Sequence, residues 1–295
     1  LGGDPLGMLV IHKNVGTREE PRFTVGHLLR VGEDEHLAMS YANASPAVLD
    51  YNGDGLLDIV ACMNDRLVYY PNVGTATEPR LGDAVLIKLD GNDTLPYQGL
   101  SFVHANWKEG DPNHFLFGSA QFVYHVQNKG SVEKPDYTLS GPILQNNAPL
   151  LVDAFAMPHI ADWNGDGKPD LLVGDEHGFV TYFENRSRAT PPQPDFRHGE
   201  LIMVGEEPLR YVSDFSMSGP DEGLLGYANP IARDWDHDGD LDLLVGVAEP
   251  TLFFYENIGP EPVDEGIPGG SLLAAFGYFE RKPSLAPGIK ITVNG

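Results

Sequence analysis

The sequence is poor in cysteine, in basic residues and in long apolar runs. Its 295 residues include one cysteine, Cys62, so no disulfide can form within the chain. Only 19 Lys and Arg oppose 43 Asp and Glu, which gives a formal net charge of −24. Such a surface repels phosphate backbones and argues against a nucleic-acid partner. No apolar run approaches the roughly 18 residues of a membrane-spanning helix, so we expect no membrane insertion.

Glycine and proline, in contrast, are abundant, with 34 Gly and 24 Pro. This composition favours many short strands joined by turns and disfavours long helices. The 41% of apolar residues is enough for a sizeable core. The composition therefore predicts an all-β fold.

One unit recurs along the chain: an acidic loop, an apolar strand, a turn, an aromatic strand ending in Asn, and a Pro followed by an apolar residue. Three copies are nearly complete: Asp50–Leu81, Asp162–Phe196 and Asp234–Val263. A fourth copy ends at Tyr137, and the chain opens on the tail of a fifth that ends at Phe23. Repeats of this length with about four short strands are typical of β-propeller blades.

The asparagines at the end of the aromatic strands set the period. Their separations are 58, 56, 57 and 72 residues, and they are Asn14, Asn72, Asn128, Asn185 and Asn257. We therefore expect residues 1–295 to form one propeller of about five four-stranded blades.

The two chain ends carry complementary strands. Met8–Lys13 and Arg22–Arg30 fit outer strands, whereas Leu272–Glu280 and Ile289–Val293 fit inner strands. Pairing them in one blade would close a five-bladed ring and remove its open edges. The alternative is that the chain is a slice of a longer propeller with six to eight blades.

Three acidic loops recur in phase with this repeat. Each has carboxylate or amide oxygens at positions 1, 3, 5 and 9, a Gly at position 6, and a residue at position 7 that would offer its backbone carbonyl. The ligands predicted in this way are Asp50, Asn52, Asp54, Leu56 and Asp58; Asp162, Asn164, Asp166, Lys168 and Asp170; and Asp234, Asp236, Asp238, Asp240 and Asp242. Ligation by oxygen alone in a flexible loop suits Ca²⁺, and the pattern predicts about three structural calcium ions.

The fourth unit lacks this pattern. Asn106, Lys108, Gly110 and His114 fall where the first loop has Asp50, Asn52, Asp54 and Asp58. We expect no calcium there, with the Lys108 ammonium in place of the ion.

Together the loops and the period closely resemble the FG-GAP/VCBS repeats of integrin α-chains and of many secreted bacterial and fungal proteins, over about 250 residues. The resemblance implies a secreted, extracellular propeller with calcium loops between the first and second strands of a blade. It implies no single activity, because propellers of this kind include lectins, protein receptors and polysaccharide lyases.

Ligands of such propellers usually bind the face opposite the calcium loops. The turn Asp175–Gly178 and the connection Gln145–Pro158 are expected there. A longer connection, Phe196 to Asp234, has about a dozen extra residues and contains Arg210 and Tyr211. Long loops in compact folds are disproportionately functional, although a neutral surface insertion explains this one equally well.

These features leave three functional hypotheses. In the first, the protein binds or degrades extracellular polysaccharide, as a lectin or as a lyase. A lyase would use Arg to neutralise a uronate and His or Tyr to move the C5 proton, for which the candidates are His159, Tyr211 and Arg210. A lone His such as His159 is more often a structural residue than a catalytic one. The second hypothesis is an integrin-like propeller that binds a protein, and the third is a structural array within a larger secreted protein.

Overall fold

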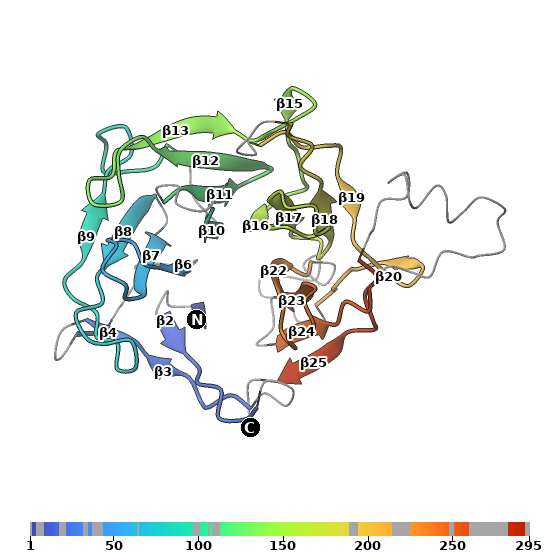
Figure 1. Cartoon of the computed structure of the whole chain (residues 1–295), viewed down its shortest axis with the longest axis horizontal. Coiled ribbons are helices and arrows are strands. Elements are labelled where there is room, and N and C mark those ends of the chain that lie inside the picture. Colours follow the sequence, from blue (N-terminus) through green and yellow to red (C-terminus); the bar gives the residue numbers. More distant parts are fainter. Residues whose placement is uncertain are drawn as a thin grey trace.

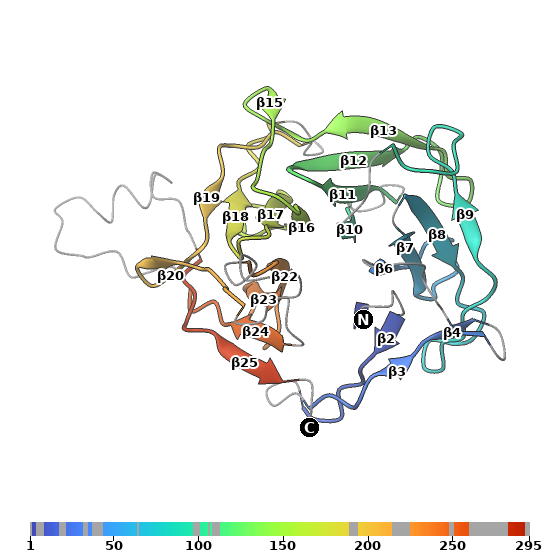
Figure 2. The same cartoon turned by 180° about the vertical axis from the view of Figure 1, so that it is seen from behind.

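The computed structural model describes residues 2–3, 9–17, 22–31, 35–36, 44–63, 65–96, 101–105, 107, 113–188, 194–213, 225–247, 251–259 and 283–292. Every regular element in these ranges is a β-strand, and the strands form small antiparallel sheets arranged in a ring (Figure 1; seen from behind in Figure 2). The predicted all-β propeller is therefore confirmed. Within the described ranges, no helix has the length and apolar character needed to cross a membrane.

Four sheets are complete, four-stranded blades in which neighbouring strands follow one another along the chain. The first blade contains β6 (Ala44–Leu49), β7 (Asp58–Met63), β8 (Arg66–Tyr70) and β9 (Val85–Ile87). The second contains β10 (Ser101–His104), β11 (Phe115–Ser119), β12 (Phe122–Asn128) and β13 (Tyr137–Pro142). The third contains β16 (Met157–Ala161), β17 (Asp170–Gly174), β18 (Val180–Phe183) and β19 (Glu200–Leu201). The fourth contains β22 (Asn229–Arg233), β23 (Asp242–Gly246), β24 (Thr251–Tyr255) and β25 (Ile289–Thr292).

The N-terminal residues form a fifth, three-stranded sheet from β1 (Gly2–Gly3), β2 (Leu9–Ile11) and β3 (His27–Leu28). As predicted, β2 and β3 are the outer strands of this sheet, and β3 lies at the periphery of the ring between the β6–β9 blade and β25 (Figure 1). The expectation for Ile289–Val293 is wrong: β25 pairs with β24 as an outer strand rather than as an inner strand of a closing blade. Leu272–Glu280 lies outside the described residues, so its pairing with the N-terminal sheet stays a prediction.

The connections from one sheet to the next carry short hairpins that the sequence did not predict. They pair β4 (Arg30–Val31) with β5 (Glu35–His36), β14 (Leu144–Gln145) with β15 (Ala148–Pro149), and β20 (Met203–Val204) with β21 (Glu207–Pro208). Each hairpin follows an outer strand, at the end of the blade opposite the acidic loops. These connections are long enough to present side chains beside the turns between second and third strands.

The core is divided among the interfaces between neighbouring sheets. One cluster packs the β6–β9 blade on the β10–β13 blade and includes Tyr69, Phe117 and Tyr124. Similar clusters join the second blade to the third and the third to the fourth, and a smaller one places Leu9 of the N-terminal sheet against the first blade. Burying one such side chain stabilises the fold by about 1.5–3 kcal/mol, so adjacent blades hold one another in place.

A repeated contact ties each outer turn to the preceding blade. The apolar residue that closes a repeat bridges the Asn of its own blade and also a residue beyond the preceding outer strand. Leu81 bridges Asn72 and Val31, Phe196 bridges Asn185 and Gln145, and Leu285 bridges Asn257 and Val204.

The last copy of this contact corrects one predicted boundary. The repeat that begins at Asp234 closes at Leu285 and not at Val263. Asn257 and Leu285 are 28 positions apart in the sequence, against 9 for Asn72 and Leu81, so this repeat is longer but ends in the same closing contact. Pro283-Ser284-Leu285 matches Pro79-Arg80-Leu81 in pattern, and this was the available signal in the sequence.

Candidate functional site

The three acidic loops connect the first and second strands of the β6–β9, β16–β19 and β22–β25 blades, as predicted. The glycine at position 6 has a positive φ in each: 85° at Gly55, 84° at Gly167 and 102° at Gly239. A side chain at this position would be strained, which explains why all three loops have Gly there. The sharp turn directs the side chains of positions 1, 3 and 5 inward.

In the first loop, backbone N–H groups donate hydrogen bonds to the carboxylate of Asp50. Asp50 Oδ1 accepts from Gly53 N at 2.8 Å, and Asp50 Oδ2 accepts from Gly55 N at 2.9 Å. The side-chain amide of Asn52 donates to Asp54 Oδ2 at 2.8 Å. Each oxygen keeps further lone pairs, so these residues have the donor atoms that a cation of the calcium type prefers.

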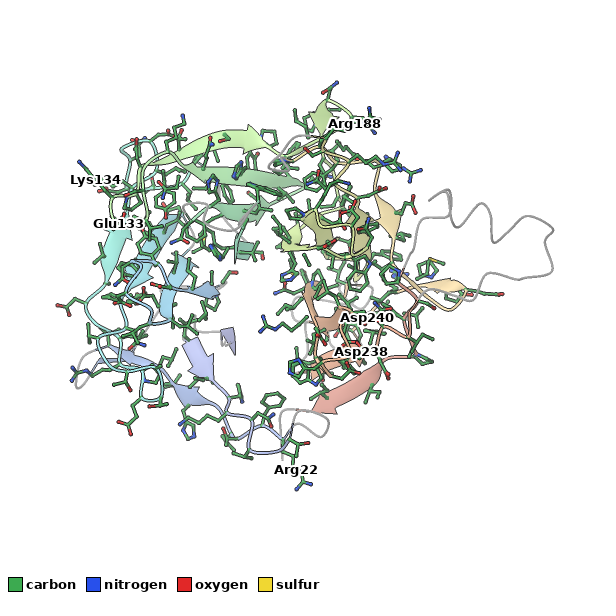
Figure 3. The ribbon with its side chains drawn as sticks, in the orientation of Figure 1. Arg22, Glu133, Lys134, Arg188, Asp238 and Asp240 are labelled. Carbon is green, nitrogen blue, oxygen red and sulfur yellow. The ribbon has the colours of Figure 1, made fainter. Side chains whose placement is uncertain are left out.

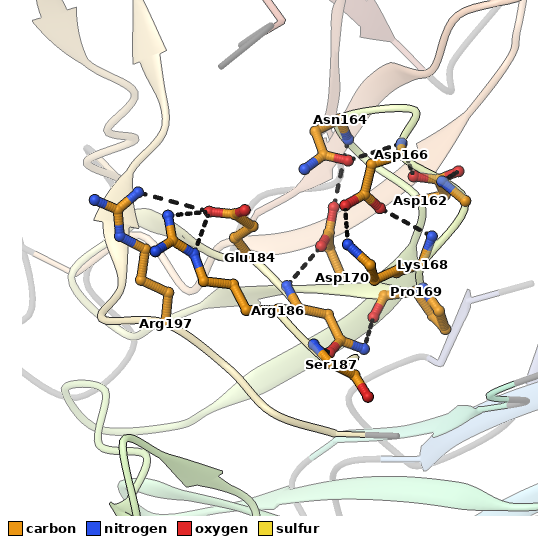
Figure 4. A network of polar contacts seen from close by, with 12 residues as sticks. Asp162, Asn164, Asp166, Lys168, Pro169, Asp170, Glu184, Arg186, Ser187 and Arg197 are labelled. Atoms are coloured by element: carbon orange, nitrogen blue, oxygen red, sulfur yellow. Dashed lines mark hydrogen bonds and ion pairs between the residues drawn. The ribbon is translucent and has the colours of Figure 1, made fainter. Parts of the chain in front are cut away.

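The second loop repeats this geometry with one difference (Figure 4). Asp162 accepts from Asp166 N and Gly167 N, both at 2.9 Å. The Lys168 ammonium, at position 7, pairs with Asp166 Oδ2. The other two loops have Leu56 and Asp240 at this position. The positive charge of Lys168 therefore offsets part of the negative charge of the second loop alone.

The third loop has the highest charge and fits a cation best. The ligand oxygens of Asp234, Asp236 and Asp238 all lie within 4.8 Å of one another. Asp234 Oδ1 and Asp240 Oδ1 are buried, and no hydrogen-bond partner for them exists in the described part of the chain. Burial, and then the charge of Asp238, raises the pKa of Asp240 to about 6. Figure 3 labels Asp238 and Asp240 in the β22–β25 blade.

Position 9 of each loop is a buried carboxylate, with exposures of 0% for Asp58, 0% for Asp170 and 1% for Asp242. Asp170 Oδ1 accepts from Asn185 N at 2.8 Å, and Asp170 Oδ2 accepts from Trp163 N at 3.1 Å and from Tyr182 Oη at 3.2 Å. Burial raises the pKa of Asp170 to about 7.

The same two backbone contacts recur at Asp58 and Asp242. Asp58 accepts from Asn72 N at 2.7 Å and from Tyr51 N at 3.1 Å. Asp242 accepts from Asn257 N and from Trp235 N, both at 2.9 Å. These carboxylates therefore tie the acidic loop to the Asn turn of the same blade, in addition to their predicted role as ligands.

In the β10–β13 blade, a pair of histidines replaces this arrangement. His114 takes the position of Asp58, as the sequence predicts, and His114 Nδ1 lies 3.0 Å from His125 Nε2. The strand register places His125 opposite Leu116, as Tyr182 lies opposite Leu172 in the third blade. Burial, and then the charge of His114, lowers the pKa of His125 to about 4. Asn106, Lys108 and Gly110 lie outside the described residues, so the role of the Lys108 ammonium stays a prediction.

The candidate catalytic residue His159 lies on the inner strand β16, half-buried against the next blade. Its Nε2 is 3.3 Å from the carbonyl oxygen of Ala232 in β22. Burial lowers the pKa of His159 to about 4, so the ring is neutral at pH 7 and donates to that carbonyl. This contact joins two blades and supports the structural explanation of His159.

The other two candidates, Arg210 and Tyr211, pack on the turn between β17 and β18. Arg210 Nε donates to His177 O at 3.1 Å, and its guanidinium lies 4.9 Å from the centre of the Phe179 ring. Tyr211 N donates to Gly178 O at 2.9 Å. A Cβ on Gly178 would lie 1.8 Å from the carbonyl oxygen of Tyr211, so only Gly allows this approach. Among the described contacts, none joins His159 to this pair.

The same turn carries a group that the sequence analysis missed. Asp153, Glu176 and His177 have ligand atoms within 4.8 Å of one another. Glu176 and His177 lie on the turn after β17, whereas Asp153 lies on the connection before β16. No sequence spacing joins these two segments, which explains why the group escaped notice.

Comparisons with known proteins add no identity to this geometry. No family model matches the sequence, and no curated protein matches it significantly. A proposal about function therefore depends on the sequence pattern and on the geometry at the two ends of the blades.

Proposed function

We propose that the protein is an extracellular, calcium-stabilised propeller that binds or cleaves acidic polysaccharide at the end of the blades opposite the acidic loops. Calcium would be held by positions 1, 3, 5, 7 and 9 of each loop. The chemistry of the third loop supports this assignment, because buried oxygens of Asp234 and Asp240 have no hydrogen-bond donor among the described residues. A bound divalent cation would supply their missing partner and offset the repulsion between the carboxylates.

The observation that carries the polysaccharide proposal is the arrangement around Arg210 and Tyr211. Arg210 lies beside His177, and Tyr211 packs on Phe253 with ring centres 5.1 Å apart. A second ring pair, Phe155 and Tyr227, lies on the connections that flank the same turn, 5.4 Å apart. A cation beside partly exposed aromatic rings suits a uronate, because the cation can bind the carboxylate while a ring stacks on the sugar.

If the site is catalytic, its chemistry would be β-elimination. A neutral His or a Tyr would take the C5 proton, the C4–O bond would break, and the leaving oxygen would receive a proton. Arg210 would neutralise the uronate carboxylate and so make the C5 proton more acidic. His159 is committed to the Ala232 carbonyl, so Tyr211, which adjoins Arg210, is the candidate to take this proton.

The direct test is a screen against uronate-containing polysaccharides that follows the ultraviolet absorbance of the unsaturated product, together with a glycan array. We expect binding or product with the calcium-loaded protein, and its loss in Arg210→Ala. Arg197→Ala is the matched control, because Arg197 also lies at the surface but pairs with Glu184 on the outer strands. Absence of both binding and product on every polyuronate would contradict the proposal.

A further inference from the structure

Asp153, Glu176 and His177 combine two carboxylates with one imidazole at the end of the blades opposite the acidic loops. Nδ1 of His177 lies 2.8 Å from Oδ2 of Asp153, and the ligand atoms of all three residues lie within 4.8 Å of one another. Two ligands bound tetrahedrally at about 2.0–2.1 Å from a zinc ion are separated by about 3.3 Å. The three side chains are thus already close to the spacing of a ligand set.

Backbone hydrogen bonds from both neighbouring connections fix this turn. Glu176 N donates to Ala154 O at 2.9 Å, which holds the turn beside Asp153. On the other side, Glu176 O accepts from Gly226 N at 2.7 Å and from Tyr227 N at 3.1 Å. A ligand set held in this way needs little rearrangement to bind an ion, which lowers the entropic cost of binding.

His177 Nδ1 lies against the carboxylate of Asp153 without a hydrogen bond of good geometry between them. This Nδ1 is a buried atom that makes no hydrogen bond within the described part of the chain, although Asp153 Oδ2 lies 2.8 Å away. The orientation of that contact is therefore not that of a hydrogen bond. A buried imidazole nitrogen that faces a carboxylate oxygen in this way offers a lone pair to a metal.

The local charge favours a cation. Asp175, on the same turn, is buried and accepts from Phe179 N at 3.0 Å, so it cannot turn away. Burial raises the pKa of Glu176; the charge of His177 opposes this effect, and the charges of Asp153 and Asp175 add to it. A divalent cation would relieve the repulsion among these carboxylates.

We propose that Asp153, Glu176 and His177 form a binding site for a divalent transition metal, with Zn²⁺ as the best fit. Mixed nitrogen and oxygen ligation suits zinc, whereas calcium prefers oxygen ligands alone. Asp153 and His177 are 55% and 36% exposed, so the site opens to solvent. Three protein ligands leave a coordination position for water or for an anionic ligand. This inference is independent of the proposed action on polysaccharide.

The test is isothermal titration calorimetry of the protein with Zn²⁺ in the presence of excess Ca²⁺, which keeps the acidic loops filled. We expect one saturable site. His177→Gln and Asp153→Asn should each weaken it by at least about tenfold, since even changes behind the ligands of a metal cost 10–100-fold. Binding of Co²⁺ should give a visible absorption spectrum that the same variants abolish.

The matched control is His237→Gln. His237 Nδ1 also faces an aspartate, at 3.9 Å from Asp234 Oδ2, but in the third acidic loop. We expect this variant to bind Zn²⁺ as the unchanged protein does. Loss of binding in His237→Gln, equal binding in His177→Gln, or no saturable site in the calcium-loaded protein would each overturn the proposal. Glu176→Gln gives an independent check if one of the other variants fails to fold.

Discussion

The β16–β19 and β10–β13 blades have the same order of strands but differ in one pair of buried polar side chains. In the third blade, Asp170 accepts hydrogen bonds from Tyr182 and from three backbone N–H groups. In the second blade, His114 and His125 occupy the positions of Asp170 and Tyr182 and contact each other. In these two blades both members of the pair differ together, because a buried donor needs an acceptor beside it. The fourth blade has Phe254 at the position of Tyr182, and there Asp242 accepts from the backbone N–H groups of Trp235 and Asn257.

The second blade also supports its neighbour's acidic loop. Asn113 precedes His114, and its side-chain amide donates to Tyr51 O at 3.0 Å in the loop of the β6–β9 blade. His104 Nε2 lies 3.1 Å from Asn113 Oδ1 and orients this amide. A blade without the acidic pattern thus helps to shape a loop that has it.

The largest effect should come from removing the buried carboxylate in Asp170→Ala. Three backbone N–H groups and the Tyr182 hydroxyl would lose their acceptor, at a cost of about 1–3 kcal/mol for each buried donor. We expect the free energy of unfolding at pH 7 to fall by about 4 kcal/mol, measured by urea denaturation. Asp166→Ala, in the exposed part of the same loop, is the control and should cost much less. Equal losses in the two variants would contradict a special role for position 9.

The next largest effect should follow chelation of calcium. An ion present at a hundred times its Kd stabilises the folded state by about 2.7 kcal/mol, so EDTA should lower the melting temperature and added Ca²⁺ should restore it. Asp234→Asn combined with Asp238→Asn should remove a large part of this shift. A variant in the second blade, His125→Phe, should retain it. An unchanged melt in EDTA would mean that the loops are not structural calcium sites.

The histidine pair should make the second blade sensitive to acid. His125 Nε2 accepts a hydrogen bond from Trp107 Nε1 at 3.2 Å, which requires a neutral ring. Its pKa is about 4 in the folded protein and near 6.5 in an unfolded chain, so the unfolded state binds more protons between these values. The contribution to stability is complete above pH 6.5 and is lost as the pH falls toward 4.

We therefore expect His125→Phe, which copies Phe254 of the fourth blade, to reduce the loss of stability between pH 7 and pH 4.5 by about 2 kcal/mol. Urea denaturation across this range measures the slope directly. His198→Phe is a suitable control, because His198 is exposed. An unaltered pH dependence in His125→Phe would show that the pair does not carry the acid sensitivity.

The smallest effect should be a gain in stability in the third loop. His237 has a φ of 66° at position 4, where the first and second loops have Gly53 and Gly165 at 79° and 70°. A residue with a side chain is strained in this conformation. His237→Gly should raise the free energy of unfolding by up to about 1 kcal/mol, measured in excess Ca²⁺. A loss of stability would indicate that the His237 side chain contributes a contact that the other loops lack.

Much of the fold could be predicted from local signals. The strands around Asp58, Asp170 and Asp242 and the positive φ at the three glycines follow from residue type and spacing. The closing role of Leu285 was harder to predict, because Leu285 is 28 positions from its bridge partner Asn257 in the sequence. The wrong placement of Ile289–Val293 has the same origin: an apolar strand fits an inner or an outer position equally well until its partner is known.

The candidate sites also include features that the sequence predicts and features that depend on the folded structure. The acidic loops are contiguous in the chain, so their ligand spacing is visible in the sequence. The role of Asp170 as an acceptor for Trp163 and Asn185, and the meeting of His114 with His125, depend on strands that pair only in the folded blade.

The sequence by itself determined the repeat, the all-β class and the acidic loops, because turn residues, apolar alternation and ligand spacing act over a few residues. Tertiary structure alone decided which residues meet between blades. Asp153 and His177 lie on different connections, and His159 contacts Ala232 across a blade interface. Such contacts arise because each blade buries its apolar face against the next, which brings together side chains whose separation in the chain carries no signal.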